Sequence, residues 1–165
     1  MQQRVGGNDS FDWNWATYRE GFGSMDSDFF LGLEKIHRIT SLQRFELYIH
    51  LVDYDGDIYF AHYDDFKISD EEHGYALSLG SFNGTAEEDA MRNGENMKFS
   101  TFDRDHDIID GNCAVEYRSG WWYKDCYNCN LNAPYGPNLS WWVKNKIELI
   151  EAKMLIRPAV EEVSN

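Results

Sequence analysis

One stretch of about 50 residues, from Met91 to Trp142, shows neither of the hydrophobic periods that mark helices and strands. It nevertheless contains all three cysteines and four of the six tryptophans of the chain. A compact domain seldom holds so long an irregular region unless it is a functional loop region fixed by other means. Cross-links or a bound metal ion would be such means, so the fold should depend on what holds this stretch in place.

The chain has 165 residues and a formal net charge of −14. This length predicts a single domain, large enough to bury a core without a metal or a disulfide. The excess of acids opposes binding to phosphate groups, which argues against nucleic acid and anionic membranes as partners. Apolar runs such as 152–156 are too short to span a bilayer, so no membrane insertion is expected. Residues 1–7 lack the apolar core of a signal peptide, so the chain is either cytosolic or an incomplete precursor.

Alternation of apolar and polar residues predicts several antiparallel strands. Residues 45–51 and 58–63 alternate around the turn-forming residues 53–57, which predicts a hairpin. Shorter strands are expected at 66–68 and 75–79. Near the end, the alternation slips by one residue between Leu149 and Ala152, which indicates a β-bulge in a final strand.

Two short helices are expected before the first long strand. Asp12 or Asn14 can cap a helix over 15–18, which Gly21 and Gly23 would end. A second helix is expected at about 33–39. The chain is therefore predicted to be an α+β domain, a twisted antiparallel sheet with short helices and one loop-rich region.

A run of acids within the irregular stretch has the composition of a calcium loop. Carboxylates stand at alternate positions in Asp103, Asp105 and Asp107, and Gly111 follows. Ca²⁺ takes six to eight oxygen ligands, and such a loop can wrap around it. The spacing differs from that of an EF-hand, and a solvated acidic loop is the alternative. A similar acidic triplet at 53–57 is already explained by the hairpin turn.

The three cysteines allow different chemistries. A Cys113–Cys126 disulfide would close a short loop and contribute about 3 kcal/mol on the chain-entropy model, leaving Cys129 over. The rivals are a structural zinc site formed by the cysteines with His106, or a redox role for Cys126 and Cys129.

Three Asn-x-Ser/Thr triplets begin at Asn8, Asn83 and Asn138. Each is a glycosylation acceptor only if the chain enters the secretory pathway. If it does, the oxidising compartment favours the disulfide over the zinc site.

The sequence gives little support to an enzyme. The five histidines are scattered, and neither a nucleophile elbow nor a glycine-rich phosphate loop is present. Aromatic residues concentrate instead between Trp121 and Trp142, where they serve either as core or as the walls of a pocket for a small ligand or a sugar substituent.

Several ordered motifs resemble those of the fibrinogen C-terminal domain, whose relatives include fibrinogen γ chain, ficolins, tachylectins, tenascins and angiopoietins. The motifs are WATYREGFG (15–23), FFLGLEKIH (29–37), MKFSTFDRD (97–105), GNCA (111–114), GWWY (120–123), NLN (130–132) and MLIRP (154–158). Their agreement in order and spacing extends from about Gln2 to Pro158.

The resemblance implies a secreted, extracellular α+β domain with Ca²⁺ as its cofactor. The ion would be bound by the side chains of Asp105 and Asp107 and by the main-chain carbonyls of Ile109 and Gly111, with Asp103 just outside. It also implies the Cys113–Cys126 disulfide. Cys129 would then be free or form an intermolecular link.

The resemblance further implies a ligand pocket beside the calcium loop, as in the acetyl-binding lectins of the family. Tyr117 matches an aromatic wall of that pocket. Tyr127 follows the second cysteine, Cys126, at a position usually held by histidine after a cis peptide. A later tyrosine-alanine pair is missing from a shortened loop, where only Tyr135 remains nearby.

The expected domain covers residues 1–158, lacks the N-terminal subdomain of the family as if truncated or started late, and is followed by a polar tail at 159–165. The expected function is that of a non-enzymatic, calcium-dependent, lectin-like module that binds glycans or acetylated groups in innate immune recognition. The alternative is an angiopoietin-like ligand for a cell-surface receptor, without a working sugar pocket. A homo-oligomer is compatible with either function.

Overall fold

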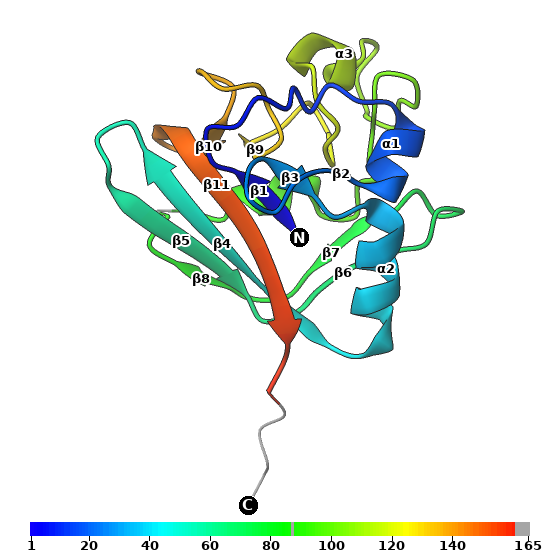
Figure 1. Ribbon diagram of the computed structural model, residues 1–165. Helices are drawn as coiled ribbons and strands as arrows, with labels where there is room; N and C mark the ends of the chain where they lie inside the picture. Colours follow the sequence, from blue (N-terminus) through cyan, green and yellow to red (C-terminus); the bar gives the residue numbers. More distant parts are fainter. Residues whose placement is uncertain (87, 161–165) are drawn as a thin grey trace, which may run out of the picture.

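The computed structural model describes residues 1–86 and 88–160 (Figure 1), so residues 161–165 of the predicted tail lie outside the described residues. The elements in chain order are β1 (Gln2–Arg4), α1 (Trp15–Glu20), β2 (Phe22–Gly23), β3 (Phe29–Phe30), α2 (Leu33–Leu42), β4 (Phe45–Asp53), β5 (Ile58–Tyr63), β6 (Phe66–Ile68), β7 (Leu77–Leu79), β8 (Phe82–Gly84), the 3₁₀ helix η1 (Ala90–Gly94), α3 (Cys113–Tyr117), β9 (Cys129–Asn130), β10 (Ser140–Trp142) and β11 (Lys146–Pro158).

The main sheet is antiparallel and has the strand order β2-β3-β1-β11-β4-β5-β8. Strand β11 pairs with β10 through Lys146 to Glu148, then with β4 from Leu149 to Pro158. The same strand therefore joins the sheet to the upper, loop-rich part of the molecule, which contains α3, β9 and β10 (Figure 1). The predicted α+β class is confirmed.

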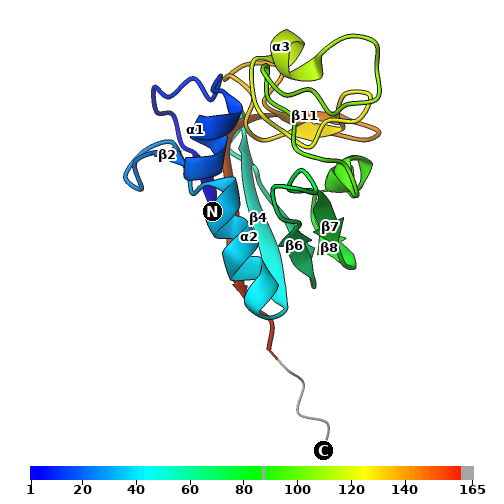
Figure 2. The same cartoon turned by 90° about the vertical axis from the view of Figure 1, so that its right-hand side faces the viewer.

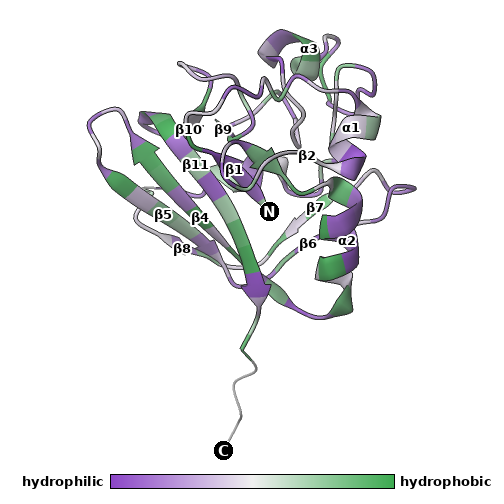
Figure 3. Ribbon diagram, viewed as in Figure 1, coloured by the Kyte–Doolittle hydropathy of each residue, from purple (hydrophilic) through white to green (hydrophobic). Residues whose placement is uncertain are grey.

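Alternation determines which face of the sheet is buried. Leu47, Ile49 and Leu51 of β4 are fully buried, while the residues between them lie on the outer face. The hydropathy of β4 and β11 alternates in the same way along each strand (Figure 3). The pairing of β11 with β4 shifts register between Leu149 and Glu151, which confirms the predicted bulge.

Helix α2 lies on the inner side of the sheet, where it packs against β6 and α1 (Figure 2). Asn14 is the residue that caps α1, since its Oδ1 accepts a hydrogen bond of 3.0 Å from the backbone N–H of Thr17. Helix α2 continues three residues beyond the predicted end, to Leu42. Within this extension the hydroxyl of Thr40 donates back to the carbonyl of Ile36 at 2.8 Å.

Strand β7 begins at Leu77, two residues later than predicted. Tyr75 instead has a positive φ of 51° and closes a turn, with its backbone N–H donating to the carbonyl of Asp70 at 2.9 Å. Its hydroxyl donates to Glu34 of α2 at 2.6 Å, so the side chain ties this turn to the helix.

A buried ion pair links the N-terminal strand to a distant loop. Arg4 and Asp28 are each 1% exposed and lie 3.0 Å apart. Arg4 also donates to the backbone carbonyls of Asp9 at 2.7 Å and Ala133 at 2.8 Å. Its guanidinium stacks over the ring of Phe11 at 4.2 Å. One side chain thus holds together β1, the loop before α1 and the loop after β9.

The carboxylate of Asp28, the acidic partner in this ion pair, also accepts several further hydrogen bonds. Its carboxylate accepts hydrogen bonds from the backbone N–H groups of Val5 at 2.8 Å and Gly7 at 3.1 Å. It also accepts one from the hydroxyl of Tyr135 at 2.7 Å. Buried charges persist in proteins only when they are paired and hydrogen-bonded in this manner.

We expect Asp28→Ala to lower the free energy of unfolding by about 3–5 kcal/mol, because it leaves the buried charge of Arg4 without a partner. Asp26→Ala, an exposed neighbour on the same loop, should change it by less than about 0.5 kcal/mol. Urea denaturation followed by tryptophan fluorescence measures both. Equal midpoints for the two variants would contradict the structural role assigned to the pair.

Candidate functional site

The acidic loop after Phe102 is folded by its own carboxylates. Oδ1 of Asp105 accepts the backbone N–H of Asp107 at 3.1 Å, and Oδ1 of Asp107 accepts that of Ile109 at 3.1 Å. Oδ2 of Asp107 accepts the N–H of Cys113 at 2.8 Å, at the start of α3. Asp107 therefore fixes the loop against the helix that follows it.

Electrostatics of the loop favour a cation. Burial, and then the neighbouring Asp105, raise the pKa of Asp107 above its usual value, which means that the ionised pair repels itself when no cation is near. The predicted donors are all oxygen atoms, the ligand type of Ca²⁺. Over the described ranges no cluster of three or more His, Cys, Asp or Glu side chains exists, so an ion here would need main-chain carbonyls such as those of Ile109 and Gly111. The residues fit Ca²⁺ and would hold it by charge neutralisation.

Asp103 has a different task from its two neighbours. Its Oδ1 accepts the backbone N–H of Trp15 at 2.9 Å and the hydroxyl of Thr101 at 2.7 Å. The carboxylate thus anchors the start of α1 to the loop.

A disulfide joins Cys113 and Cys126, with an S–S distance of 2.10 Å and a Cα–Cα distance of 5.7 Å. The bond uses two of the three thiols, so the zinc and redox alternatives are wrong. Cys129 is free and 1% exposed, and burial raises the pKa of its thiol. The predicted intermolecular link is therefore excluded by burial in the folded chain, whereas the free thiol is confirmed.

A pocket of about 270 Å³ lies beside this disulfide. It is lined by Tyr117, Asp125, Cys126, Tyr127, Asn138, Ser140, Trp142 and Lys146. The rings of Tyr117 and Tyr127 meet edge to face, with centroids 4.8 Å apart. The peptide bond between Asp125 and Cys126 is cis. The acidic loop is tied to the same segment, since the N–H of Ile108 donates to the carbonyl of Lys124 at 3.1 Å.

Three of the four predicted pocket residues, Tyr117, Cys126 and Tyr127, are brought together. Tyr135 is not, because its hydroxyl bonds to Asp28 and to the backbone of Gly6 at 2.7 Å each. Its ring also stacks on the Arg4 guanidinium at 4.3 Å. The expectation that Tyr135 forms a pocket wall is thus corrected, since the buried ion pair binds it elsewhere.

Sequence reasoning did not place Asn138 and Lys146 in the pocket, and it offered Trp142 only as one of several aromatic residues that could form core or pocket walls. The hydroxyl of Tyr127 donates to Oδ1 of Asn138 at 3.4 Å, so this predicted glycosylation acceptor is a pocket wall. Trp142 is 49% exposed at the pocket. Its presence in the aromatic run was a usable signal, whereas nothing in the sequence marked Lys146.

Comparisons with known proteins give the family. Residues 1–159 match the fibrinogen beta and gamma chains, C-terminal globular domain. Tenascin-R from Homo sapiens is 40% identical over 165 residues, which cover 96% of this chain and 12% of tenascin-R. Ficolin-3 from Homo sapiens is 40% identical over 135 residues, which cover 82% of this chain and 45% of ficolin-3. The chain thus spans less than half the length of either relative.

Solved structures agree with this assignment. The fibrinogen-like globe domain of human ANGPTL2 has a TM-score of 0.90 and 34% identity, covering 96% of this chain and 79% of that one. The lamprey fibrin D-dimer, complexed with the peptide Gly-His-Arg-Pro-amide, has a TM-score of 0.91 and 29% identity, covering 100% of this chain and 62% of that one. The chain therefore belongs to the family of fibrinogen C-terminal globular domains.

Proposed function

We propose that this domain is a secreted, calcium-stabilised recognition module that binds glycans or other acetylated groups in the pocket between Tyr117 and Tyr127, as part of innate immune recognition. The observation that carries the proposal is the edge-to-face pair of these tyrosines, fixed beside the disulfide. An acetyl methyl group suits such an apolar wall, while its oxygen needs a nearby donor. The Lys146 ammonium at the pocket supplies such a donor.

In this proposal the protein binds without carrying out chemistry. Asp105 and Asp107, with the carbonyls of Ile109 and Gly111, would hold Ca²⁺, whose charge would neutralise the two carboxylates and stiffen the loop up to α3. The disulfide transmits that order to Cys126 and hence to Tyr127. The Ca²⁺ ion would therefore act on ligand affinity by organising the pocket before the ligand arrives.

Secretion is supported by the disulfide, which persists in oxidising compartments. Across residues 1–86 and 88–160, no helix is long and apolar enough to cross a membrane.

Addition of Ca²⁺ to chelator-treated protein should raise the melting temperature, because the ion binds the folded state alone. At a Ca²⁺ concentration about 100 times the Kd, the gain is ~2.7 kcal/mol, or about 5–10 °C for a domain of this size. Asp105→Asn should abolish the shift, whereas Asp55→Asn in the β4–β5 turn should keep it. Differential scanning fluorimetry measures all three proteins.

The same shift should depend on pH. The raised pKa of Asp107 means that the folded, calcium-free protein holds this proton more tightly than the unfolded chain. Stability from this group is present at low pH and is lost as pH rises through the folded pKa, where Ca²⁺ then replaces the proton. The calcium-induced shift should shrink as pH falls below that pKa, and a shift that grows on acidification would contradict the assignment.

Retention on an acetylated-sugar resin tests the pocket. The protein should bind with Ca²⁺ present and elute with chelator or free acetate. Tyr127→Ala should weaken binding by about tenfold or more, since a lost aromatic contact of ~1.5–3 kcal/mol exceeds the 1.4 kcal/mol that corresponds to tenfold. Tyr54→Ala, an exposed tyrosine on the β4–β5 turn, is the matched control. Absence of retention at every Ca²⁺ concentration would exclude acetyl recognition.

Exposure of Trp142 supports a second candidate, a ligand for a cell-surface receptor. Trp142 is 49% exposed, and tryptophan is enriched among residues that dominate protein interfaces. A blank glycan array together with capture of a cell-surface protein, lost in Trp142→Ala, would favour this function over sugar binding.

A further inference from the structure

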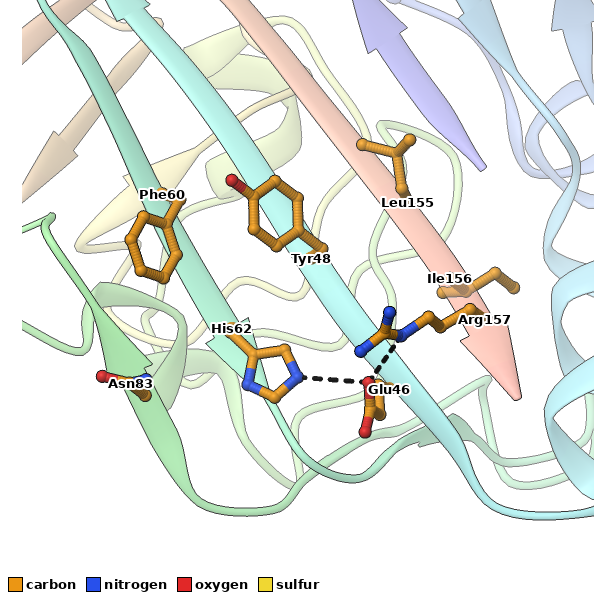
Figure 4. A pocket seen from close by; sticks show the side chains of 8 residues that line it. All are labelled: Glu46, Tyr48, Phe60, His62, Asn83, Leu155, Ile156 and Arg157. Atoms are coloured by element: carbon orange, nitrogen blue, oxygen red, sulfur yellow. Dashed lines mark hydrogen bonds and ion pairs between the residues drawn. The ribbon is translucent and has the colours of Figure 1, made fainter. Parts of the chain in front are cut away.

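The outer face of the main sheet has an exposed apolar groove that shares no lining residue with the candidate pocket. Tyr48 of β4 is 42% exposed, and Leu155 of β11 is 48% exposed. Phe60, on the neighbouring strand β5, is half-buried. The rings of Tyr48 and Phe60 are nearly parallel, 5.6 Å apart. The groove has a volume of about 570 Å³ (Figure 4). An apolar patch of this kind usually marks a surface that something covers.

Asn83 stands at the end of a straight row of side chains across this face. The strand register pairs Asn83 with His62, His62 with Tyr48, and Tyr48 with Leu155. Directly paired residues lie on the same face of a sheet. A strand spacing of about 4.8 Å places Tyr48 about 10 Å and Leu155 about 14 Å from Asn83. The exposed Asn83 amide thus opens onto the groove from the edge strand β8.

We propose that Asn83 carries an N-linked oligosaccharide whose first sugars lie in this groove, over Tyr48 and Leu155. The inference rests on the secretion stated in the proposed function, because Asn-x-Ser/Thr triplets are modified in the secretory pathway. A pyranose ring presents C–H groups on its faces and hydroxyls at its edge. The faces suit the Tyr48 and Phe60 rings, so an attached sugar chain would turn an apolar patch into a hydrated surface.

Polar groups suited to sugar hydroxyls line the far side of the groove. Arg157 donates to Oε2 of Glu46 at 2.8 Å, and its side chain remains 71% exposed (Figure 4). An exposed guanidinium keeps further N–H donors for hydroxyl oxygens. The groove therefore has aromatic rings for the C–H faces of a sugar ring and hydrogen-bond donors for its hydroxyl groups.

The local structure of the Asn83 triplet leaves the acceptor free for such an attachment. Thr85 is exposed, and its hydroxyl accepts the backbone N–H of Phe60 at 3.1 Å, which fixes the end of β8 against β5. Asn138 contrasts with it, since its amide accepts from Tyr127 and its triplet ends in the fully buried Ser140. An oligosaccharide on Asn138 would fill the candidate acetyl pocket.

Mass spectrometry of the full chain, secreted from mammalian cells with an added leader, tests the modification. Enzymatic deglycosylation in heavy-oxygen water should label Asn83 as aspartate. Asn83→Gln should remove the oligosaccharide mass from this peptide, whereas Thr85→Ser, which keeps the acceptor triplet, should retain it. Secreted protein with an unmodified Asn83 would overturn the proposal.

Hydroxyl-radical footprinting of the folded glycoprotein tests the covering of the groove. Removal of the oligosaccharide should increase oxidation of Tyr48 and Leu155 several-fold, while exposed Tyr54 at the hairpin turn should react equally before and after. Equal oxidation of Tyr48 in both forms would overturn the placement. Neither mass spectrometry nor footprinting depends on the calcium-induced change in melting temperature or on retention by the acetylated-sugar resin. Both experiments therefore test the oligosaccharide proposal even if the protein does not bind acetyl groups.

Discussion

The buried pair of Arg4 and Asp28 is the interaction on which the rest of the molecule depends. Removing two charges from water costs several kcal/mol per ion, and the ion pair with its additional hydrogen bonds offsets that cost, although the buried Nε of Arg4 has no hydrogen-bond partner among the described residues. Here the partners of Arg4 come from the turn between β2 and β3, the loop before α1 and the loop around Ala133. The same loop continues to Asn138 in the pocket wall. The charge pair thus fixes the start of the loop that leads to this wall of the candidate pocket.

The loop-rich half is held by separate devices that reinforce one another. The disulfide fixes Cys126, Asp107 fixes the acidic loop to α3, and β10 extends β11 into this half. None of these three interactions depends on a long alternation of apolar and polar residues such as that of the sheet strands. Loops supported by a rigid frame are where recognition usually resides, and this half of the molecule has that arrangement.

The long strands of the sheet were predictable from sequence because their signals are local, whereas the short strands β2, β3 and β8 were not predicted. Strand β4 shows its buried face in four alternating residues, and the bulge of β11 appears as a one-residue slip. The short elements α3, β9 and β10 were missed, since two to five residues cannot display a period. Tyr135 was misplaced for another reason: its position depends on Asp28, 107 residues away in sequence. The pairing of Cys113 with Cys126 came from family resemblance, because spacing alone left zinc and redox roles open.

The candidate pocket and the sheet groove each contain an asparagine from an Asn-x-Ser/Thr triplet, but an attached oligosaccharide would have a different consequence in each place. Asn138 and Asn83 carry identical acceptor signatures, yet one is a wall of a tyrosine-lined pocket and the other stands at the open edge of a sheet. A bulky oligosaccharide is compatible with ligand binding only at the second position. If the pocket between Tyr117 and Tyr127 functions, Asn138 must stay unmodified while Asn83 can be occupied. The fold thereby separates the disulfide-bonded end that holds the candidate pocket from a sheet face whose apolar groove can be covered without obstructing that pocket.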